Sequence, residues 1–386
     1  MKIVIAMDSF KGSVSAQRAG EALERGMRRG AHTLEIVKLP VTDGGEGLLE
    51  VLHMAKGGEF HSLEVHGPQG KPVQAKYLRL PDHTAVIESA QACGLTLLEE
   101  SERDPLGTST YGVGELIRKA LDDGCRKILI GLGGSATNDG GAGLAQALGV
   151  QLLDAQGRQL PPGGGALSHL KEIRCEKLDP RLKECSIQAA CDVTNVLSGP
   201  NGAAVVYGPQ KGATPEQVEQ LDQALGHYGS LILETLGLDM EACPGSGAAG
   251  GLGSGLLAFC GAELRSGIDI ILDAVSFEDN LAGADLVVTG EGKIDGQTTQ
   301  GKVVAGVARR AKAAGDIPVV AVVGNIGDDV REIFSQGIDA IVPISTGPMT
   351  LEESIQRAEE LLEESGERLI RLLNIGKKMG KQTNIC

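Results

Sequence analysis

Lys127–Gly143 reads KILIGLGGSATNDGGAG, an apolar segment that runs into a turn rich in glycine and polar side chains. Ile128–Ile130 is short, continuous, apolar and bounded by glycine, which predicts a buried strand. The apolar residues from Leu144 onward favour a helix. A strand, a bare-backbone turn and a helix N-terminus together form an anion site, because N–H groups reach phosphate oxygens where no Cβ intervenes and the helix dipole adds positive charge. The stretch predicts an α/β fold with a phosphate-binding turn.

The residues between these glycines favour ligand binding over simple close packing. Gly-rich turns also occur where a strand and a helix merely pack tightly, and the chain has 56 glycines, about twice the usual ~7%. Four positions inside the turn, however, carry a hydroxyl, an amide or a carboxylate: Ser135, Thr137, Asn138 and Asp139. We therefore predict that the turn binds a phosphoryl group, and that Asp139 is a candidate metal ligand.

The composition is that of a globular protein with an acidic surface. Its 386 residues suffice for two or three domains, and the net charge of −15 disfavours binding to nucleic acid or to an anionic membrane. Aromatic residues make up 2% and tryptophan is absent, so a stacked platform for nucleobases is not expected. A phosphate site in so acidic a chain needs backbone dipoles, a few lysines or a divalent cation.

The cysteines and the N-terminus predict a cytoplasmic protein. The eight cysteines form no C-x-x-C pair and several lie in apolar runs, which fits reduced thiols better than a disulfide framework. The initial MKIVIAM reads as a strand and is too short for a signal peptide. No apolar run approaches the ~20 residues of a membrane helix.

Two strands predicted near the N-terminus each deliver an aspartate just past their carboxyl ends. Ile3–Met7 ends at Asp8, with Lys11 three residues further on, and Leu34–Leu39 is followed by Asp43. Ligands of open α/β sheets bind at the carboxyl edge of the strands, so these groups are candidates for a site. Capping of the following helix is the alternative role for each aspartate.

The same arrangement recurs later in the chain. Ser186–Cys191 predicts a strand that ends at Asp192, and Asp285–Thr289 predicts one that runs into the loop Gly290–Asp295. Glu88 also ends a predicted strand, where it either faces a cleft or serves as a structural carboxylate.

The order of these segments predicts two domains. Residues 59–88 alternate in short segments with turn signals, which is typical of antiparallel strands, whereas both chain ends alternate strands and helices. We predict a doubly wound, Rossmann-like parallel-sheet α/β domain built from residues 1–58 and 283–386. An inserted mixed α/β domain, residues 59–282, carries the Gly-rich phosphate loop. The ligand is expected in the cleft between the two domains.

Phosphoryl transfer explains the chemistry of the loops. The chain has no G-x-x-x-x-G-K-[ST], no G-x-S-x-G, no H-E-x-x-H and no Cys/His zinc spacing. Acidic and glycine-rich loops instead accompany a few lysines. A phosphotransferase needs a backbone cradle, a carboxylate-held Mg²⁺, a cation on the migrating charge and a carboxylate that takes the proton of the acceptor hydroxyl.

Two other classes of function stay open on these residues alone. An NAD(P)-dependent dehydrogenase of a small hydroxy acid would use Gly131-x-Gly133-x-x-Ala136 as its dinucleotide turn, with Asp154 beyond it. Asp139 argues against this, because it places a negative charge near the pyrophosphate. A non-catalytic sugar-acid binding module would suit two domains and a cleft, but it gives no reason for so many carboxylates.

The chain resembles the bacterial type I glycerate kinases in eight ordered motifs: MDSFKGS, TDGGEG, IESAQACGL, GGSATNDGGAGL, CDVTN, YGPQKGA, PGSGAAGGLG and TGEGKIDGQT. The resemblance covers essentially the whole chain, and Val196 departs from it where the family more often has proline after CDVTN. It implies ATP-dependent, Mg²⁺-assisted phosphorylation of D-glycerate in the cytoplasm, with 2-phosphoglycerate favoured over 3-phosphoglycerate. A two-domain α/β fold is also implied, and a homo-oligomer is compatible with the sequence.

The resemblance leaves the roles of single residues open, so we assign them on physical grounds. The ATP side takes Gly133, Gly134, Ser135, Thr137 and Asn138 for the phosphates, together with Gly290, Glu291 and Asp295. Asp139 is assigned to Mg²⁺, and Lys11 to the charge on the transferring phosphoryl group. The favoured general base is Asp192, with Asp8 and Asp295 as rivals. The glycerate hydroxyls are assigned to Asp43, Glu46 and Glu88.

Overall fold

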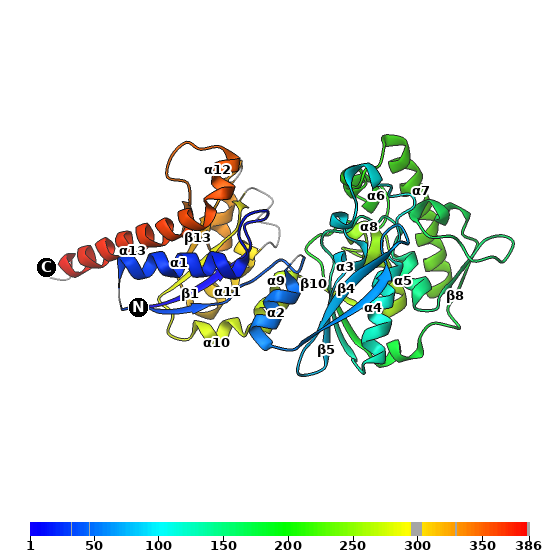
Figure 1. Ribbon diagram of the computed structural model, residues 1–386, viewed down its shortest axis with the longest axis horizontal. Helices are drawn as coiled ribbons and strands as arrows, with labels where there is room; N and C mark the ends of the chain where they lie inside the picture. The colour runs from blue at the N-terminus through cyan, green and yellow to red at the C-terminus, as the bar shows by residue number, and fades with distance from the viewer. Residues whose placement is uncertain (32, 46, 295–302, 329, 384–386) are drawn as a thin grey trace. The chain divides into compact units, whose positions relative to one another are not determined.

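Two β-sheets organise the chain (Figure 1), and each belongs to its own compact unit. The computed structural model describes residues 1–31, 33–45, 47–294, 303–328 and 330–383. The first unit comprises Met1–Asp43 and Ile268–Cys386, and the second comprises Gly44–Gly267. The predicted α/β fold class is confirmed, with a parallel sheet in the first unit and a mixed sheet in the second.

The sheet of the first unit has the strand order β15-β13-β11-β1-β2, and all its strands are parallel. Its strands are β1 (Lys2–Met7), β2 (Glu35–Lys38), β11 (Leu286–Gly290), β13 (Val319–Val323) and β15 (Ala340–Pro343). The three central strands are mainly apolar and almost entirely buried, as expected for parallel strands that are covered on both faces. Strands β1 and β11 come from opposite ends of the sequence, so the two chain ends complete one sheet.

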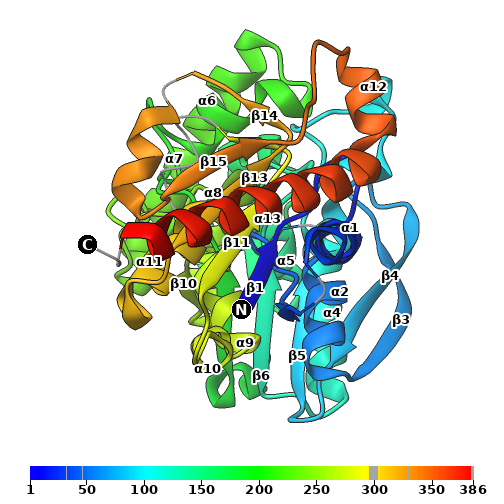
Figure 2. The same ribbon diagram turned by 90° about the vertical axis from the view of Figure 1, so that its left-hand side faces the viewer.

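Two long helices, α1 (Ala16–Gly30) and α13 (Ala358–Thr383), lie side by side in this unit (Figure 2). Gly26 allows the close approach, because a Cβ there would overlap the carbonyl oxygen of Glu363. Arg25 adds an ion pair to the Glu363 carboxylate at 3.1 Å. Apolar side chains of both helices join those of β1 in one buried cluster, which fixes the carboxyl end of β1 where Asp8 follows.

The sheet of the second unit has the order β10-β9-β6-β5-β4-β3. Its strands are β3 (Glu59–His66), β4 (Pro72–Arg79), β5 (Thr84–Glu88), β6 (Lys127–Gly131), β9 (Ser186–Ala190) and β10 (Glu263–Arg265). Strands β3, β4 and β5 pair antiparallel, which confirms the texture predicted for residues 59–88, and β5, β6, β9 and β10 pair parallel.

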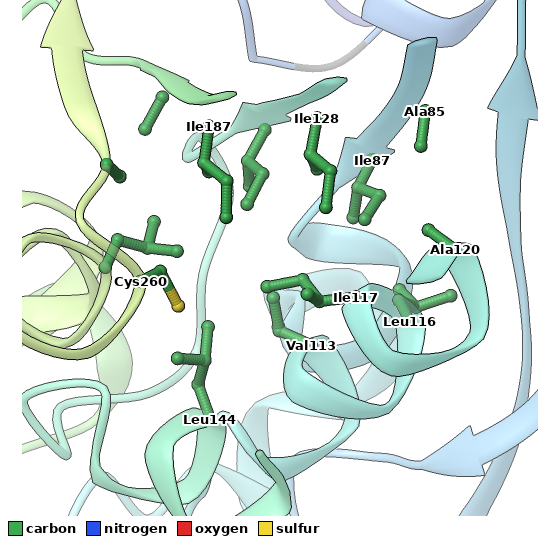
Figure 3. Close-up of a cluster of buried hydrophobic side chains, with 14 of the residues drawn as sticks. Ala85, Ile87, Val113, Leu116, Ile117, Ala120, Ile128, Leu144, Ile187 and Cys260 are labelled. Atoms are coloured by element: carbon green, nitrogen blue, oxygen red, sulfur yellow. The ribbon is translucent and has the colours of Figure 1, made fainter. Parts of the chain in front are cut away.

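A buried cluster joins this sheet to its helices (Figure 3). Ile87, Ile128 and Ile187 extend from neighbouring strands toward Val113 and Ile117 of α4 (Tyr111–Asp122). Burial of such side chains contributes roughly 1.5–3 kcal/mol each and dominates the stability of the layer. The parallel strands are thereby held in register, so that their carboxyl ends meet at one edge.

The remaining helices of the described residues are α2 (Leu48–Lys56), α3 (Ala90–Cys93), α5 (Ala142–Ala147), α6 (Ala203–Tyr207), α7 (Pro215–Leu236), α8 (Ala248–Cys260), α9 (Gly267–Ala274), α10 (Phe277–Leu281), α11 (Val303–Gly315) and α12 (Leu351–Gln356). Short strand pairs are formed by β7 (Gln151–Leu153) with β8 (Glu172–Arg174), and by β12 (Lys293–Ile294) with β14 (Asn325–Ile326). Thr214 caps α7 in a reciprocal pair with Gln217.

The units divide at residues 43/44 and 267/268, whereas the sequence suggests 58/59 and 282/283. Helix α2 contacts β4 and β5 and therefore belongs to the second unit. Ile268, at the start of α9, packs against Gly306 of α11 in the first unit. No helix in the described part of the chain is long and apolar enough to cross a membrane.

Candidate functional site

A cavity of about 570 Å³ lies at the carboxyl edge of the parallel sheet of the first unit. Four strands each contribute the residue that directly follows them: Asp8 after β1, Glu291 after β11, Gly324 after β13 and Ile344 after β15. Charged residues Lys11, Asp43 and Lys293 also line it, with Ser9, Phe10, Ser13, Gly292, Val303, Asn325, Leu351, Ser354, Ile355 and Ala358. This edge is where open α/β sheets bind their ligands.

Asp8 is the buried acid of this cavity, with only 5% of its surface exposed. The pKa of its carboxyl is raised from 3.8 to about 7, chiefly by burial and in addition by the nearby carboxylates Asp43 and Glu291. The Ser9 amide, which donates to Asp8 Oδ1 at 2.6 Å, and the Lys11 ammonium oppose this rise in pKa. A carboxyl with a pKa near 7 can accept or release a proton at neutral pH.

Lys11 is held at the tip of a small loop that follows β1. The Phe10 amide donates to Val14 O at 2.7 Å and the Val14 amide donates to Phe10 O at 3.0 Å, while Gly12 takes a positive φ of 76°. The exposed Lys11 ammonium lies 3.6 Å from Asp43 Oδ2. Such an exposed ion pair is weak, so it leaves the ammonium able to exchange partners for a more highly charged anion.

Gly290 and Glu291 occupy the end of β11. Gly290 is buried, and its carbonyl oxygen accepts the Asp8 amide at 2.9 Å, so this glycine positions Asp8. A Cβ at Gly290 would overlap Val322 O of β13. The Glu291 carbonyl oxygen accepts the Gly324 amide at 3.1 Å, while its side chain lines the cavity. Two residues predicted for the site, Glu46 and Asp295, lie outside the described residues.

In the second unit, the structure exposes only the beginning of the Gly-rich turn. Gly133 and Gly134 are exposed and Ser135 is largely buried, and we call these three residues the lip. Thr137 and Asn138 are completely buried. The sequence predicts that these two side chains bind phosphate, whereas the structure encloses them. The segment of α8 at Gly250 covers this part of the turn. A Cβ at Gly250 would overlap Thr137 O and would lie 2.8 Å from Asn138 Cα.

Asp139 also differs from its predicted role as a metal ligand. Its completely buried carboxylate accepts hydrogen bonds from the amides of Thr110, Gly141 and Gly143 and from the Thr110 hydroxyl. Burial raises the pKa of Asp139 and these hydrogen bonds lower it. Within the described residues, no group of three or more His, Cys, Asp or Glu side chains is arranged to hold a metal. Asp139 therefore orders the turn and the start of α5.

A cation that the sequence analysis did not assign, Lys211, completes the turn. It is 2% exposed, and its Nζ donates to Thr137 O at 2.6 Å and to Ser135 Oγ at 3.0 Å. The pKa of Lys211 is lowered to about 8, because the effect of burial outweighs the opposing effects of Cys93 and Asp139. Its sequence signal is the motif YGPQKGA, whose Gly and Pro residues predict a turn but do not indicate which distant loop the lysine meets.

The motif TDGGEG passes close to the ends of β6 and β9. A Cβ at Gly133 would lie 2.8 Å from Gly45 Cα, and a Cβ at Gly44 would lie 3.1 Å from Gly267 Cα. The glycines at these positions let backbone approach backbone. The lip thus lies beside a second glycine segment at the carboxyl edge of the mixed sheet.

Two predicted carboxylates, Glu88 and Asp192, lie at this same sheet edge. Glu88 is 6% exposed, and its oxygens accept the Leu49 amide at 3.1 Å and the Gln91 side-chain amide at 3.2 Å. Burial raises the pKa of Glu88. It holds the N-terminus of α2, which favours the structural alternative. Asp192 is half-buried, and its Oδ1 accepts the Gly267 amide at 2.9 Å.

Acids, lysines and glycine turns at the carboxyl ends of parallel strands define an α/β enzyme that acts on a small anionic molecule. The sequence model of the glycerate kinase family matches residues 3–374. The chain belongs to the glycerate kinase family and is a kinase, which confirms the resemblance found in its motifs.

Individual relatives match the chain over nearly their full length. The chain is 47% identical to the glycerate kinase of Bacillus subtilis (strain 168) over 98% of this chain and 99% of that one. It is 46% identical to the glycerate 2-kinase of Escherichia coli (strain K12), with the same coverage. A crystal structure from Salmonella typhimurium LT2, assigned as a glycerate kinase 2, matches with a TM-score of 0.86 and 47% identity over 98% of this chain and 99% of that one.

Proposed function

We propose that the chain transfers the γ-phosphoryl group of ATP to the 2-hydroxyl of D-glycerate in the cytoplasm, and that Mg²⁺ assists. The observation that carries the proposal is the buried Asp8 carboxyl, with a pKa of about 7, beside Lys11 in the cavity of the first unit. The choice of the 2-hydroxyl is supported by the 46% identity to a relative named glycerate 2-kinase.

Asp8 is the general base of this proposal. Its carboxylate takes the proton of the glycerate hydroxyl while that oxygen forms a bond to the γ-phosphorus and the bond to the ADP oxygen breaks. A base works best when its pKa is near the working pH, and Asp8 meets this condition within a cavity. Asp192, the base favoured from the sequence, becomes the rival here, because one of its oxygens already accepts the Gly267 amide.

Lys11 and Asp43 flank Asp8 and receive complementary roles. The Lys11 ammonium, exposed on a flexible stem, neutralises charge on the transferring phosphoryl group. Asp43 accepts a hydrogen bond from a glycerate hydroxyl, because it lines the same cavity as Lys11 and Asp8. Glu88 is not given a substrate role, because its two oxygens accept groups of the chain itself.

The residues of the cavity fit Mg²⁺, which usually binds through one or two carboxylates together with phosphate oxygens and water. Glu291 would hold it, because its carboxylate lines the cavity directly after β11. When bound, Mg²⁺ supplies charge neutralisation on the phosphate oxygens. Asp139 is unsuitable, since its oxygens are taken up by buried hydrogen bonds.

The lip of the Gly-rich turn is assigned to the ATP phosphates. Gly133 and Gly134 are exposed and lack side chains, so their amides are accessible to phosphate oxygens. Thr137 contributes through its carbonyl oxygen, which accepts the Lys211 ammonium behind the lip.

Phosphorus NMR of the product tests the proposal. The purified chain is incubated with Mg-ATP and D-glycerate, and the phosphoglycerate signal is compared with standards of 2- and 3-phosphoglycerate. We expect ADP and 2-phosphoglycerate in equal amounts, and no ADP formation with 3-hydroxypropionate, which lacks the 2-hydroxyl of glycerate. Formation of 3-phosphoglycerate would overturn the choice of hydroxyl, and no phosphoglycerate would overturn the proposed reaction.

A further inference from the structure

Lys211 is buried, with 2% of its surface exposed, and the stability of the fold alone does not explain a charged side chain at this position. Its ammonium is bonded to the Gly-rich turn through Ser135 Oγ and Thr137 O, and Asp139 lies near enough to raise its pKa. Removing an ammonium from water is costly even when it is hydrogen-bonded, and an apolar side chain of similar volume avoids this cost. The energetic cost of burying this charge therefore points to a use beyond holding the fold.

The Lys211 ammonium donates two hydrogen bonds to the part of the turn that carries the lip. Ser135 is itself a lip residue, and Thr137 follows two positions later. On its other side the lip is fixed by backbone hydrogen bonds, since the Leu95 amide donates to Gly134 O at 2.8 Å and the Ala136 amide donates to Cys93 O at 2.7 Å. The position of the lip is thus fixed by hydrogen bonds from the Lys211 side chain and by hydrogen bonds with the backbone of the segment Cys93–Leu95.

The charge of Lys211 has a second effect. The whole chain carries a net charge of −15, and a triphosphate is also strongly negative. The chain as a whole therefore repels such a ligand. A positive charge close behind the lip, poorly screened because it is buried, favours an anion there more than an exposed lysine would. The Cys93 thiol, whose pKa is raised to about 12 by burial, stays neutral, so among the charged groups named around Lys211 only Asp139 opposes it.

We propose that Lys211 is a positioning residue for nucleotide binding, which holds the lip in its phosphate-receiving conformation through Ser135 and Thr137. The proposal rests on the function proposed above and adds a nucleotide-specific role to a residue that does not itself touch ATP. It predicts that loss of the ammonium weakens ATP binding and leaves glycerate binding unchanged.

The test uses Lys211→Met, which keeps the volume and removes the charge, with Lys183→Met on an exposed site of the same unit as the matched control. Binding of a non-hydrolysable ATP analogue with Mg²⁺ is measured by calorimetry, and KM values are measured for ATP and for D-glycerate. We expect Lys211→Met to weaken analogue binding and to raise the ATP KM about tenfold or more. The D-glycerate KM should stay within about twofold, and Lys183→Met should match the unchanged protein.

Ser135→Ala removes one acceptor of Lys211 and keeps its charge. We expect this variant to bind the analogue about threefold more weakly, and the double variant to bind it no more weakly than Lys211→Met alone, because both changes break the same contact. If Lys211→Met fails to fold, Ser135→Ala decides alone, and unchanged analogue binding in it overturns the proposal.

The results separate this proposal from the proposed function. An unchanged ATP KM in folded Lys211→Met overturns the positioning role while the unaltered chain still makes phosphoglycerate. A loss confined to the D-glycerate KM, or to kcat in proportion to a lower folded fraction, also overturns it. If the unaltered chain binds no ATP analogue, the assignment of ATP is wrong, and Lys211 has no nucleotide to position.

Discussion

The Lys11 ammonium lies 3.6 Å from the Asp43 carboxylate, and these two side chains act on the pKa of Asp8 in opposite directions. Lys11 lowers the pKa of Asp8 and Asp43 raises it. Lys11→Met should therefore move the acid-side midpoint of kcat/KM upward, and Asp43→Asn should move it downward. We expect shifts of about half a pH unit, which shrink in high salt because Lys11 is exposed. Shifts of the same sign in both variants would contradict this electrostatic arrangement.

Asp8 should also make the stability of the chain depend on pH. Because its folded pKa of about 7 is above its usual 3.8, the native state keeps a proton that the unfolded state releases between these values. The stabilisation is present at low pH and is lost as the pH rises through 7. Asp8→Asn should therefore raise the free energy of unfolding by about 2 kcal/mol at pH 8 and change it little below pH 4. Denaturant titrations at both pH values measure this, with the exposed Asp316→Asn as control.

The two candidate bases are separated by their asparagine variants. If Asp8 takes the hydroxyl proton, Asp8→Asn should lower kcat about 100-fold or more, since general base catalysis typically contributes 10²–10⁴. Asp192→Asn keeps an oxygen that can accept the Gly267 amide, and we expect it to lower kcat less than about tenfold. Steady-state kinetics at saturating ATP and D-glycerate compares them. A larger loss in Asp192→Asn would transfer the role to Asp192.

The sheet and its acidic edge could be predicted because their signals are local. Apolar runs such as Ile3–Met7 are followed at once by a polar residue, and in parallel sheets all such ends meet at one edge. Asp8 and Glu291 were therefore expected near each other although they are far apart in the sequence, and both line the cavity. The antiparallel strands of residues 59–88 were visible for the same reason.

Burial inside the Gly-rich turn could not be predicted, because it depends on distant segments. Thr137 and Asn138 have the composition of a ligand loop, and they are enclosed by a segment about 110 residues further along the chain. Lys211 likewise reaches Ser135 from another turn. The sequence does not distinguish an aspartate that binds a metal from one that caps a helix, and Asp139 is such a case.

Asp139 should affect stability more than the Mg²⁺ requirement. Asp139→Asn replaces one oxygen by an NH₂ group that faces donors such as the amides of Gly141 and Gly143, and it leaves Lys211 without its opposite charge. A loss of roughly 1–3 kcal/mol follows for each buried donor that is left without its acceptor. Urea unfolding measures it, with Asp122→Asn, which loses an exposed ion pair to Arg181, as control. Unchanged stability together with weaker Mg²⁺ activation would restore the metal role.

Gly250 offers the sharpest test of how the turn is enclosed, because Gly237 provides a control with the same backbone conformation. Both glycines have a φ of 73°, but a Cβ at Gly237 meets nothing within 4 Å, whereas one at Gly250 would overlap Thr137 O and lie 2.8 Å from Lys211 Nζ. Gly237→Ala should cost about 1 kcal/mol, the price of left-handed alanine. Gly250→Ala must also displace the turn, so we expect at least ~3 kcal/mol and a raised ATP KM. Equal losses in the two variants, measured by urea unfolding, would mean that backbone strain alone explains Gly250.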